Sequence, residues 1–260
     1  MKMDLHMRII ALGTGESCDH HSSKLNNLAP DIEKIAFHRA FMLLKERGVD
    51  VDYWTWTDPD AAESGLKWMV ANPTEKHPKI ILPYWSRSES DISKFYPIAS
   101  NLKFTGRIKE HFRLLNNESV KKNITFLDNA INYVKQSSLA TDNRFSGNQI
   151  VFHTPNKKTG NGGQGYGAEN VFTRHLLPIC HYLGANEVYN LGLDNQGLGF
   201  NRGVSQWKGQ SHEVNESLGY FKQWMEWDKE HNMKIYRCME DKFTNLGDIV
   251  PYKPLEDLYE

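Results

Sequence analysis

Short apolar runs alternate with amphipathic segments along most of the chain. The runs are typical of buried strands, and most stop at a glycine, proline or aspartate; they cover 8–12, 35–38, 51–57, 79–82, 149–152, 187–191 and 233–237. Helical patterns cover 40–47, 120–134, 168–183 and 213–231. Strands that alternate with helices predict right-handed crossovers and a mostly parallel sheet with helices on both faces.

The fold class that follows is α/β, with a single Rossmann-like domain over 1–260 built on a doubly wound sheet. Between 86 and 148 the pattern weakens into polar clusters, which indicates a helical insertion or lid. Ligands of such sheets bind outside the carboxyl ends of the strands. Distinctive loops follow strand ends in this chain and are expected to converge on one crevice: 13–17, 58–59, 160–167 and 192–194.

Composition narrows the class of protein without naming one. Hydrophobic residues make up 39% and charged residues 24% of the 260, and no apolar run approaches the roughly 18 residues of a membrane-spanning helix. The N-terminus lacks the apolar stretch of a secretory signal, so we expect a cytoplasmic protein without a transmembrane segment. Cys18, Cys180 and Cys238 are odd in number and far apart, which fits reduced thiols.

Charge is balanced overall but unevenly placed. A net charge of −1 gives no general field that attracts nucleic acid. Residues 103–122, however, hold six basic side chains against only Glu110 and Glu118. Two interpretations stay open for this segment: a solvated helix face, or contact with a phosphate-rich acceptor such as DNA.

The loop at 13–17, Gly-Thr-Gly-Glu-Ser, follows the first predicted strand. It lacks the third glycine of the dinucleotide fingerprint and the lysine of a P-loop, so neither of those site classes is supported. Gly13 and Gly15 let the backbone approach a phosphate or ribose closely, and Thr14 and Ser17 add hydroxyl groups. The pattern predicts a nucleotide-binding loop, and a plain turn is the alternative.

Acidic residues follow two other predicted strands. Asp58 and Asp60 have the spacing of the DxD clamp that holds a divalent ion in many glycosyltransferases. In the alternative, Asp58 contacts the nucleotide or sugar directly while Asp60 caps the next helix. Asp194, in Gly-Leu-Asp at 192–194, belongs either to a turn or to a ribose-binding site, and its place at a strand end favours the ribose.

His212 is the best candidate for a general base. An imidazole near neutral pKa can take a proton from an acceptor hydroxyl. In the alternative, His212 is only a helix-boundary residue beside Ser211 as the N-cap. The cluster of Cys18, His20 and His21 lacks a second ligand pair with metal spacing, so no metal site is predicted there.

Three stretches resemble one superfamily, and the similarity is spread over most of the chain. Residues 9–17 resemble the opening strand and GxGPS loop of the bacterial lipooligosaccharide sialyltransferases and motility-accessory-factor glycosyltransferases, with Glu16 in place of the proline. Residues 39–59 are similar to the second landmark of these enzymes. Residues 183–194 resemble the third, a helix end, a strand and a G-x-D turn. The superfamily also resembles archaeal hydroxymethylpterin diphosphokinases.

The resemblance implies a Rossmann-like transferase that needs no metal and has a histidine base downstream. It implies that the nucleotide is held by Gly13, Thr14, Gly15, Ser17, Gly192, Asp194 and the 160–170 loop with Gly167 and Glu169. The chain departs from the sialyltransferases after the G-x-D turn, where their tyrosines hold the leaving phosphate. Arg202 is the candidate for that role here, and His212 stands two positions after the place of the histidine of the family.

The primary hypothesis is a glycosyltransferase that moves a sugar from a nucleotide-sugar to an acceptor hydroxyl, without a further cofactor. His212 acts as base, with Asp58 next in line, and Arg202 stabilises the departing phosphate. The acceptor is a glycan, a protein or a hydroxylated base in DNA. The alternatives are an ATP-dependent diphosphokinase with Asp58, Asp60 and Asp194 as magnesium ligands, and a nucleotide-binding regulator without turnover.

Overall fold

The structure, a computed structural model, describes five long stretches of the chain and four short ones. The described residues are 7–56, 59–83, 87–89, 102–127, 175–194, 218, 221–222, 224–225 and 233–259. The strands are β1 (Met7–Leu12), β2 (Ile32–Phe37), β3 (Tyr53–Thr55), β4 (Lys79–Pro83), β5 (Ile124–Leu127), β6 (Ala185–Leu191) and β7 (Lys234–Arg237). The α-helices are α1 (Glu16–His21), α2 (Ala40–Glu46), α3 (Pro59–Ala71), α5 (Leu102–Leu115), α6 (Glu118–Lys121) and α7 (Leu177–Tyr182), and 3-10 turns form η1 (Ser22–Asn27), η6 (Asp241–Phe243) and η7 (Leu255–Leu258).

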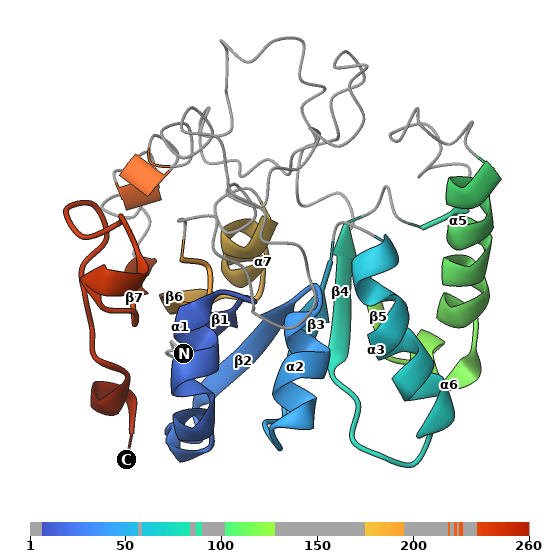
Figure 1. Ribbon diagram of the computed structural model, residues 1–260, viewed down its shortest axis with the longest axis horizontal. Helices are drawn as coiled ribbons and strands as arrows, with labels where there is room; N and C mark the ends of the chain where they lie inside the picture. Colours follow the sequence, from blue (N-terminus) through green and yellow to red (C-terminus); the bar gives the residue numbers. More distant parts are fainter. Residues whose placement is uncertain are drawn as a thin grey trace, which may run out of the picture. The chain divides into compact units, whose positions relative to one another are not determined.

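The strands form a seven-stranded sheet in the order β5-β4-β3-β2-β1-β6-β7 (Figure 1). The described strand pairs are all parallel. The predicted Rossmann-like α/β fold is therefore confirmed. In the part of the chain that the structure describes, no helix is both long enough and apolar enough to cross a membrane.

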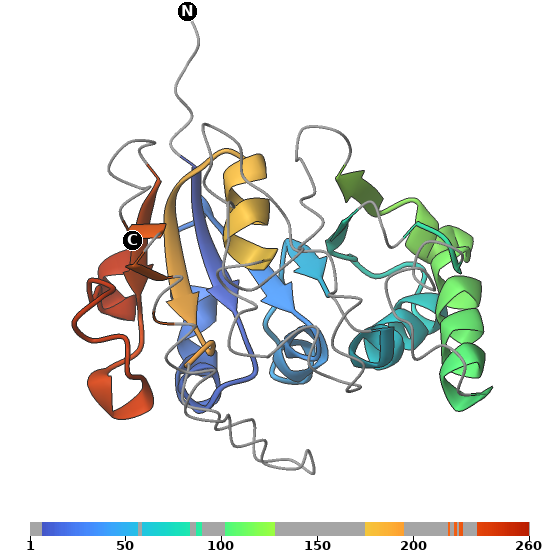
Figure 2. The same ribbon diagram turned by 90° about the horizontal axis from the view of Figure 1, so that it is seen from above.

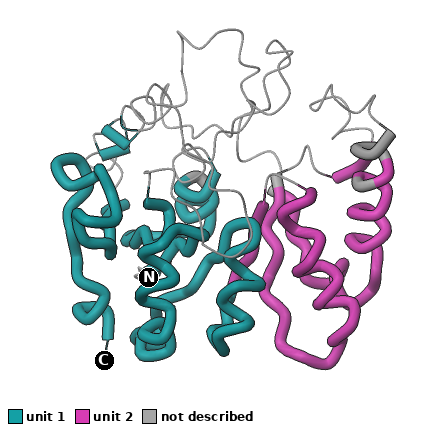
Figure 3. Tube along the Cα trace, viewed as in Figure 1, with its two compact units in different colours: residues 1–52, 168–260 teal, residues 53–167 magenta. Residues whose placement is uncertain are grey.

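The chain divides into two compact units (Figure 3). Unit 1 combines residues 1–52 with 168–260, and unit 2 is the continuous stretch 53–167. The segment 86–148, expected from the sequence to be an insertion or lid, lies within unit 2. Its described part contributes α5, α6 and β5, so it continues the alternation of helix and strand.

In unit 1, β1 lies between β2 and β6 and is the centre of the core. Residues Ile9, Ile10, Ala11 and Leu12 have no exposed surface, because a parallel strand covered on both faces is apolar along its whole length. Helix α7 covers one face of these strands, and α1 and α2 cover the other (Figure 2). In the described part of unit 1, helices thus cover both faces of these strands, and ligands of such sheets bind at the carboxyl ends of the strands.

In unit 2, α3 and α5 pack together, and Leu66 and Met69 of α3 are fully buried. The helix predicted over 120–134 is wrong beyond Lys121, because α6 ends there and residues 124–127 form β5. Ile-Thr-Phe-Leu is rich in β-branched and aromatic side chains, which favours a strand beside β4. An apolar run this short fits one face of a helix as well as a strand.

The C-terminal residues form a strap over unit 1. The backbone N–H of Arg237 donates to the carbonyl of Pro251 and that of Lys253 donates to the carbonyl of Arg237, both at 2.9 Å, so 251–253 run beside β7. The Lys253 ammonium lies over the stacked rings of Tyr189 and Tyr236, 5.2 and 5.1 Å from their centroids. The strap thereby covers polar backbone groups of β7, which an uncovered edge strand would expose.

Candidate functional site

The loops after β1 and β6 meet at the carboxyl ends of these neighbouring strands. The backbone N–H of Gly13 donates to the carbonyl of Leu191 at 2.9 Å, and that of Gly15 donates to the carbonyl of Gly192 at 2.7 Å. From β1 the chain proceeds to β2 on one side, and it returns to the other side of β1 only with β6. The two loops therefore lie at the topological switch point, where open α/β sheets bind their ligands.

Ser17 and Asp194 connect these loops by buried hydrogen bonds. The Ser17 hydroxyl donates to Oδ1 of Asp194, and the Ser17 backbone N–H donates to Oδ2 at 3.0 Å. The N–H of Gly192 in turn donates to the Ser17 hydroxyl at 2.9 Å. Ser17 is fully buried and Asp194 is 5% exposed. Two residues 177 positions apart thus form one polar cluster at the switch point.

Asp194 also caps helix α1. The residue at the N-cap position is Gly15, which has no side chain to accept the first amides of the helix. The carboxylate of Asp194 supplies that acceptor from the loop after β6, since Ser17 lies in the first turn. The backbone groups at the start of α1 are therefore already paired with an internal anion.

The three glycines of these loops are required by contacts within the protein. A Cβ on Gly15 would lie 2.5 Å from Oδ2 of Asp194 and 2.6 Å from the carbonyl oxygen of Gly192. A Cβ on Gly13 would overlap the Gly192 carbonyl group, and Gly192 itself has φ of +84°, where glycine is strongly favoured. The space that the sequence analysis assigned to a phosphate or ribose at Gly13 and Gly15 is filled by protein.

Burial raises the pKa of the Asp194 carboxyl group to about 6, and its hydrogen bonds from Ser17 oppose this shift. The nearby charge of Glu16 adds to the increase. The group therefore changes its charge close to neutral pH, in a range where most aspartates are fully ionised. A perturbed carboxyl group at a strand end is a candidate for function.

A second group of residues at the carboxyl edge of unit 1 escaped the sequence analysis. His38 directly follows β2, and its backbone has φ of +51°. No other non-glycine residue in the described stretches has a positive φ. The ring of His38 stacks on Phe37 with the centroids 3.6 Å apart, and the ring of His175 meets Phe37 edge-on at 5.6 Å. The apolar run at 35–38 predicts His38 as the last residue of a strand, whereas β2 ends at Phe37; the polar pair His38-Arg39 between two apolar runs was the available signal.

The remaining predicted site residues are only partly described. Thr14 is partly exposed on the loop after β1, and Asp60 lies in the first turn of α3. Five others lie outside the described residues: Asp58, Gly167, Glu169, Arg202 and His212. Their roles stay predictions from the sequence.

No metal-binding group emerges from the described stretches, since none of them brings three His, Cys, Asp or Glu side chains together. His21, considered with Cys18 and His20, directs Nε2 to the Glu240 carboxylate at 3.1 Å. Burial raises the pKa of the Cys18 thiol, which keeps it protonated.

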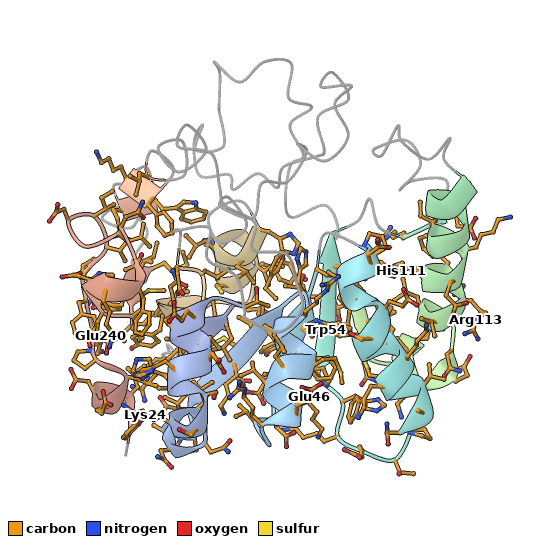
Figure 4. The ribbon with its side chains drawn as sticks, viewed as in Figure 1. Lys24, Glu46, Trp54, His111, Arg113 and Glu240 are labelled. Carbon is orange, nitrogen blue, oxygen red and sulfur yellow. The ribbon has the colours of Figure 1, made fainter. Side chains whose placement is uncertain are left out.

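The described part of the basic segment 103–122 carries opposite charges as well. The Arg113 guanidinium donates two hydrogen bonds of 2.7 Å to the Glu110 carboxylate on the outer face of α5 (Figure 4). Lys109, Lys121 and Lys122 are exposed. The cationic surface of this segment is therefore smaller than its composition indicates.

Comparison with known proteins adds no further assignment. No protein-family model, curated protein or solved structure matches the chain. The resemblance to the sialyltransferase superfamily accordingly stays a prediction from three stretches of sequence.

Proposed function

We propose that this protein is a nucleotide-sugar-dependent transferase whose donor binds at the carboxyl ends of β1 and β6. One observation carries the proposal. The two loops at the switch point of a parallel sheet are two of the four that the sequence pattern selected for ligand binding, and a buried aspartate joins them. Plain turns require no buried carboxylate, which is costly to desolvate.

The contacts at this edge favour recognition of ribose or base over recognition of a diphosphate by the glycine loop. The first turn of α1 already holds the Asp194 carboxylate, and a second anion there would meet like-charge repulsion. A hydroxyl group of ribose can instead pair with the hydroxyl group of Thr14, which is partly exposed on the loop after β1. The phosphates then extend away from the glycine loop, toward the other residues of the site.

A diphosphokinase remains the second candidate because it was the alternative from sequence. It would use Asp194 as a magnesium ligand together with Asp58 and Asp60. Both oxygens of Asp194 accept hydrogen bonds from Ser17, which favours the transferase. Turnover that survives EDTA would exclude the diphosphokinase, whereas ATP-dependent turnover restored by magnesium would replace our proposal.

A thermal-shift panel of CMP, UDP, GDP and ATP derivatives tests nucleotide binding. Ligand at about 100 times its dissociation constant stabilises the native state by roughly 2.7 kcal/mol. For a chain of this size that corresponds to a rise in Tm of about 5–10 °C. Release of free nucleotide from the sugar derivative that binds then tests transfer, with water as the acceptor. Binding without release would identify a regulator instead.

A pair of matched variants locates the binding edge. Thr14→Val keeps the shape of the side chain and removes the hydroxyl group on the loop after β1, so the affinity for nucleotide should fall about tenfold. Thr125→Val makes the same change at an exposed position of β5 and should leave the affinity unchanged. Equal nucleotide affinities in the two variants would show that the Thr14 hydroxyl group does not contact the ribose.

A further inference from the structure

His38 stands at the same edge of unit 1 as the switch-point cluster. It follows β2, the strand that pairs with β1 on the side opposite β6. The carboxyl ends of β6, β1 and β2 thus present Asp194, the glycine loop and His38 in adjacent positions. A group that acts on a ligand bound at the switch point has to stand at one of these strand ends.

The backbone of His38 is held in a conformation that is uncommon for residues other than glycine. A φ of +51° lies in the left-handed region, which glycine adopts freely and which side chains with a Cβ adopt at a cost. Residues held in such conformations cluster at active sites and ligand contacts. Glycine or asparagine would adopt this backbone conformation with less strain. The turn therefore does not explain why a histidine is present, and we look for a role of the imidazole ring.

The surroundings of His38 keep its imidazole neutral and oriented. Phe37 stacks on one face of the ring, and Phe37 in turn meets the edge of the buried His175. Burial, together with the charges of His175 and Arg39, lowers the pKa of His38 well below its usual value. Burial alone lowers the pKa of His175 to about 3. A neutral imidazole is the form that accepts a proton, and an anionic donor bound nearby would raise its pKa again.

We propose that His38 is the proton acceptor of the transfer reaction, positioned by Phe37 and His175 at the end of β2. The acceptor hydroxyl gives its proton to a ring nitrogen of His38. The oxygen lone pair forms the new bond to the anomeric carbon, and the bond from that carbon to the phosphate oxygen breaks with its electrons on the departing nucleotide. This inference rests on the proposed function, and it assigns to His38 the role that the sequence analysis assigned to His212.

Replacement of His38 by glycine is the sharpest test, because glycine removes the imidazole and also relieves the backbone strain. His38→Gly should fold with an unchanged or higher Tm and bind nucleotide as the wild type does. Its turnover, measured as nucleotide release, should fall by roughly 10²–10⁴-fold. Added imidazole should restore part of the lost rate, since it can enter the space left by the side chain. A purely structural role would produce no such rescue.

Two further variants make every outcome decisive. His38→Asn suits the left-handed backbone and cannot accept the proton, so it should lose turnover to the same extent. His212→Gly, treated in the same way with imidazole, compares the two candidate bases. Rescue of His212→Gly with full activity of both His38 variants would overturn the assignment while leaving the transferase in place. Absence of nucleotide release from every donor by the wild type would overturn the transferase and the assignment together.

Discussion

Gly15 is one of three glycines at the switch point that leave no room for a side chain. Gly15→Ala would place a Cβ 2.5 Å from the Asp194 carboxylate and 2.6 Å from the Gly192 carbonyl oxygen. Because both neighbours are held by hydrogen bonds, we expect a loss of about 1–3 kcal/mol in the free energy of unfolding. Chemical denaturation measures it directly.

The matched control for this substitution lies in helix α5. A Cβ on Gly106 would meet no atom within 4 Å, and the position is exposed. Gly106→Ala should raise stability by about 0.5–1 kcal/mol, because glycine is unfavourable inside a helix. If Gly15→Ala were as stable as Gly106→Ala, the close packing of the two loops would be contradicted.

Asp194 should make the stability of the protein depend on pH in an unusual direction. Its folded pKa of about 6 lies above the ordinary value of 3.8, so the folded state holds the proton longer than the unfolded state. The retained proton stabilises the folded state. This contribution to the free energy of unfolding is fully present below pH 3.8, and it is lost as pH rises through about 6, a decrease of about 3 kcal/mol. Asp194→Asn cannot ionise and should lack this loss.

The measurement is the difference in unfolding free energy between wild type and Asp194→Asn at pH values from 4 to 7. The difference isolates this carboxyl group from all others. Asp248→Asn, at an exposed position in the same unit, should follow the wild-type profile. A wild-type profile in Asp194→Asn as well would show that the carboxyl group titrates normally.

Sequence alone could select Ser17 and Asp194 and place their loops at one edge of the sheet, but it could not predict the hydrogen bonds between them. Each follows an apolar run that ends at glycine, which is a local signal. Their hydrogen bond depends on β6 lying next to β1, and strand order is not encoded in local periodicity. The left-handed backbone of His38 was equally hidden, because no glycine or asparagine marks the turn.

Helix α5 carries an imidazole without a hydrogen-bond partner. His111 is 3% exposed, and neither of its ring nitrogens has a partner in the described structure. The rings of Trp56 and Phe112 each form a T-shaped pair with it, with 5.8 and 5.6 Å between centroids. His111→Leu should therefore leave stability at pH 7 unchanged or raise it by up to about 1 kcal/mol, because a buried unpaired polar group is removed.

His111→Leu should also make the free energy of unfolding less sensitive to acid. Burial lowers the pKa of His111 to about 4 from 6.5, so the unfolded state binds a proton before the folded state does. The wild-type free energy of unfolding is therefore unaffected by this group above pH 6.5, and protonation of His111 in the unfolded state lowers it by about 3 kcal/mol as pH drops to 4. His77→Leu is the control, since its nitrogens contact the carbonyls of Asn72 at 2.8 Å and Ser119 at 3.3 Å. That variant should be destabilised at pH 7.

The outer surface of α5 allows a test of DNA as the acceptor. Lys109→Glu with Arg113→Glu reverses two exposed cations, one of them beside Glu110. If DNA binds here, affinity should fall and the slope of log K against log salt should decrease by about 2, without a change in nucleotide affinity. Lys234→Glu, on β7, is the control. If turnover on a free sugar or peptide is insensitive to salt and is the same in the double variant as in the wild type, DNA is excluded as the acceptor.

Elements were predictable where burial dictates their pattern. Strands β1, β4 and β6 were recognised because most of their buried positions hold apolar residues. Helix α1 was missed, since its N-terminal acceptor is Asp194 and not a capping residue next to it in sequence. Strand β5 was mistaken for part of a helix because its four residues lie within an amphipathic window.

At the scale of the whole molecule, the division into units determines the order in which parts of the chain can become native during synthesis. Unit 2 is continuous in sequence and can fold as soon as it leaves the ribosome, whereas unit 1 needs both ends of the chain. Strand β1 waits for β6 to be translated, about 10–35 s at typical rates of roughly 5–20 residues per second. During that interval one edge of a strand whose last four residues are apolar is unpaired, so the nascent chain is most prone to aggregation before residues 185–191 emerge.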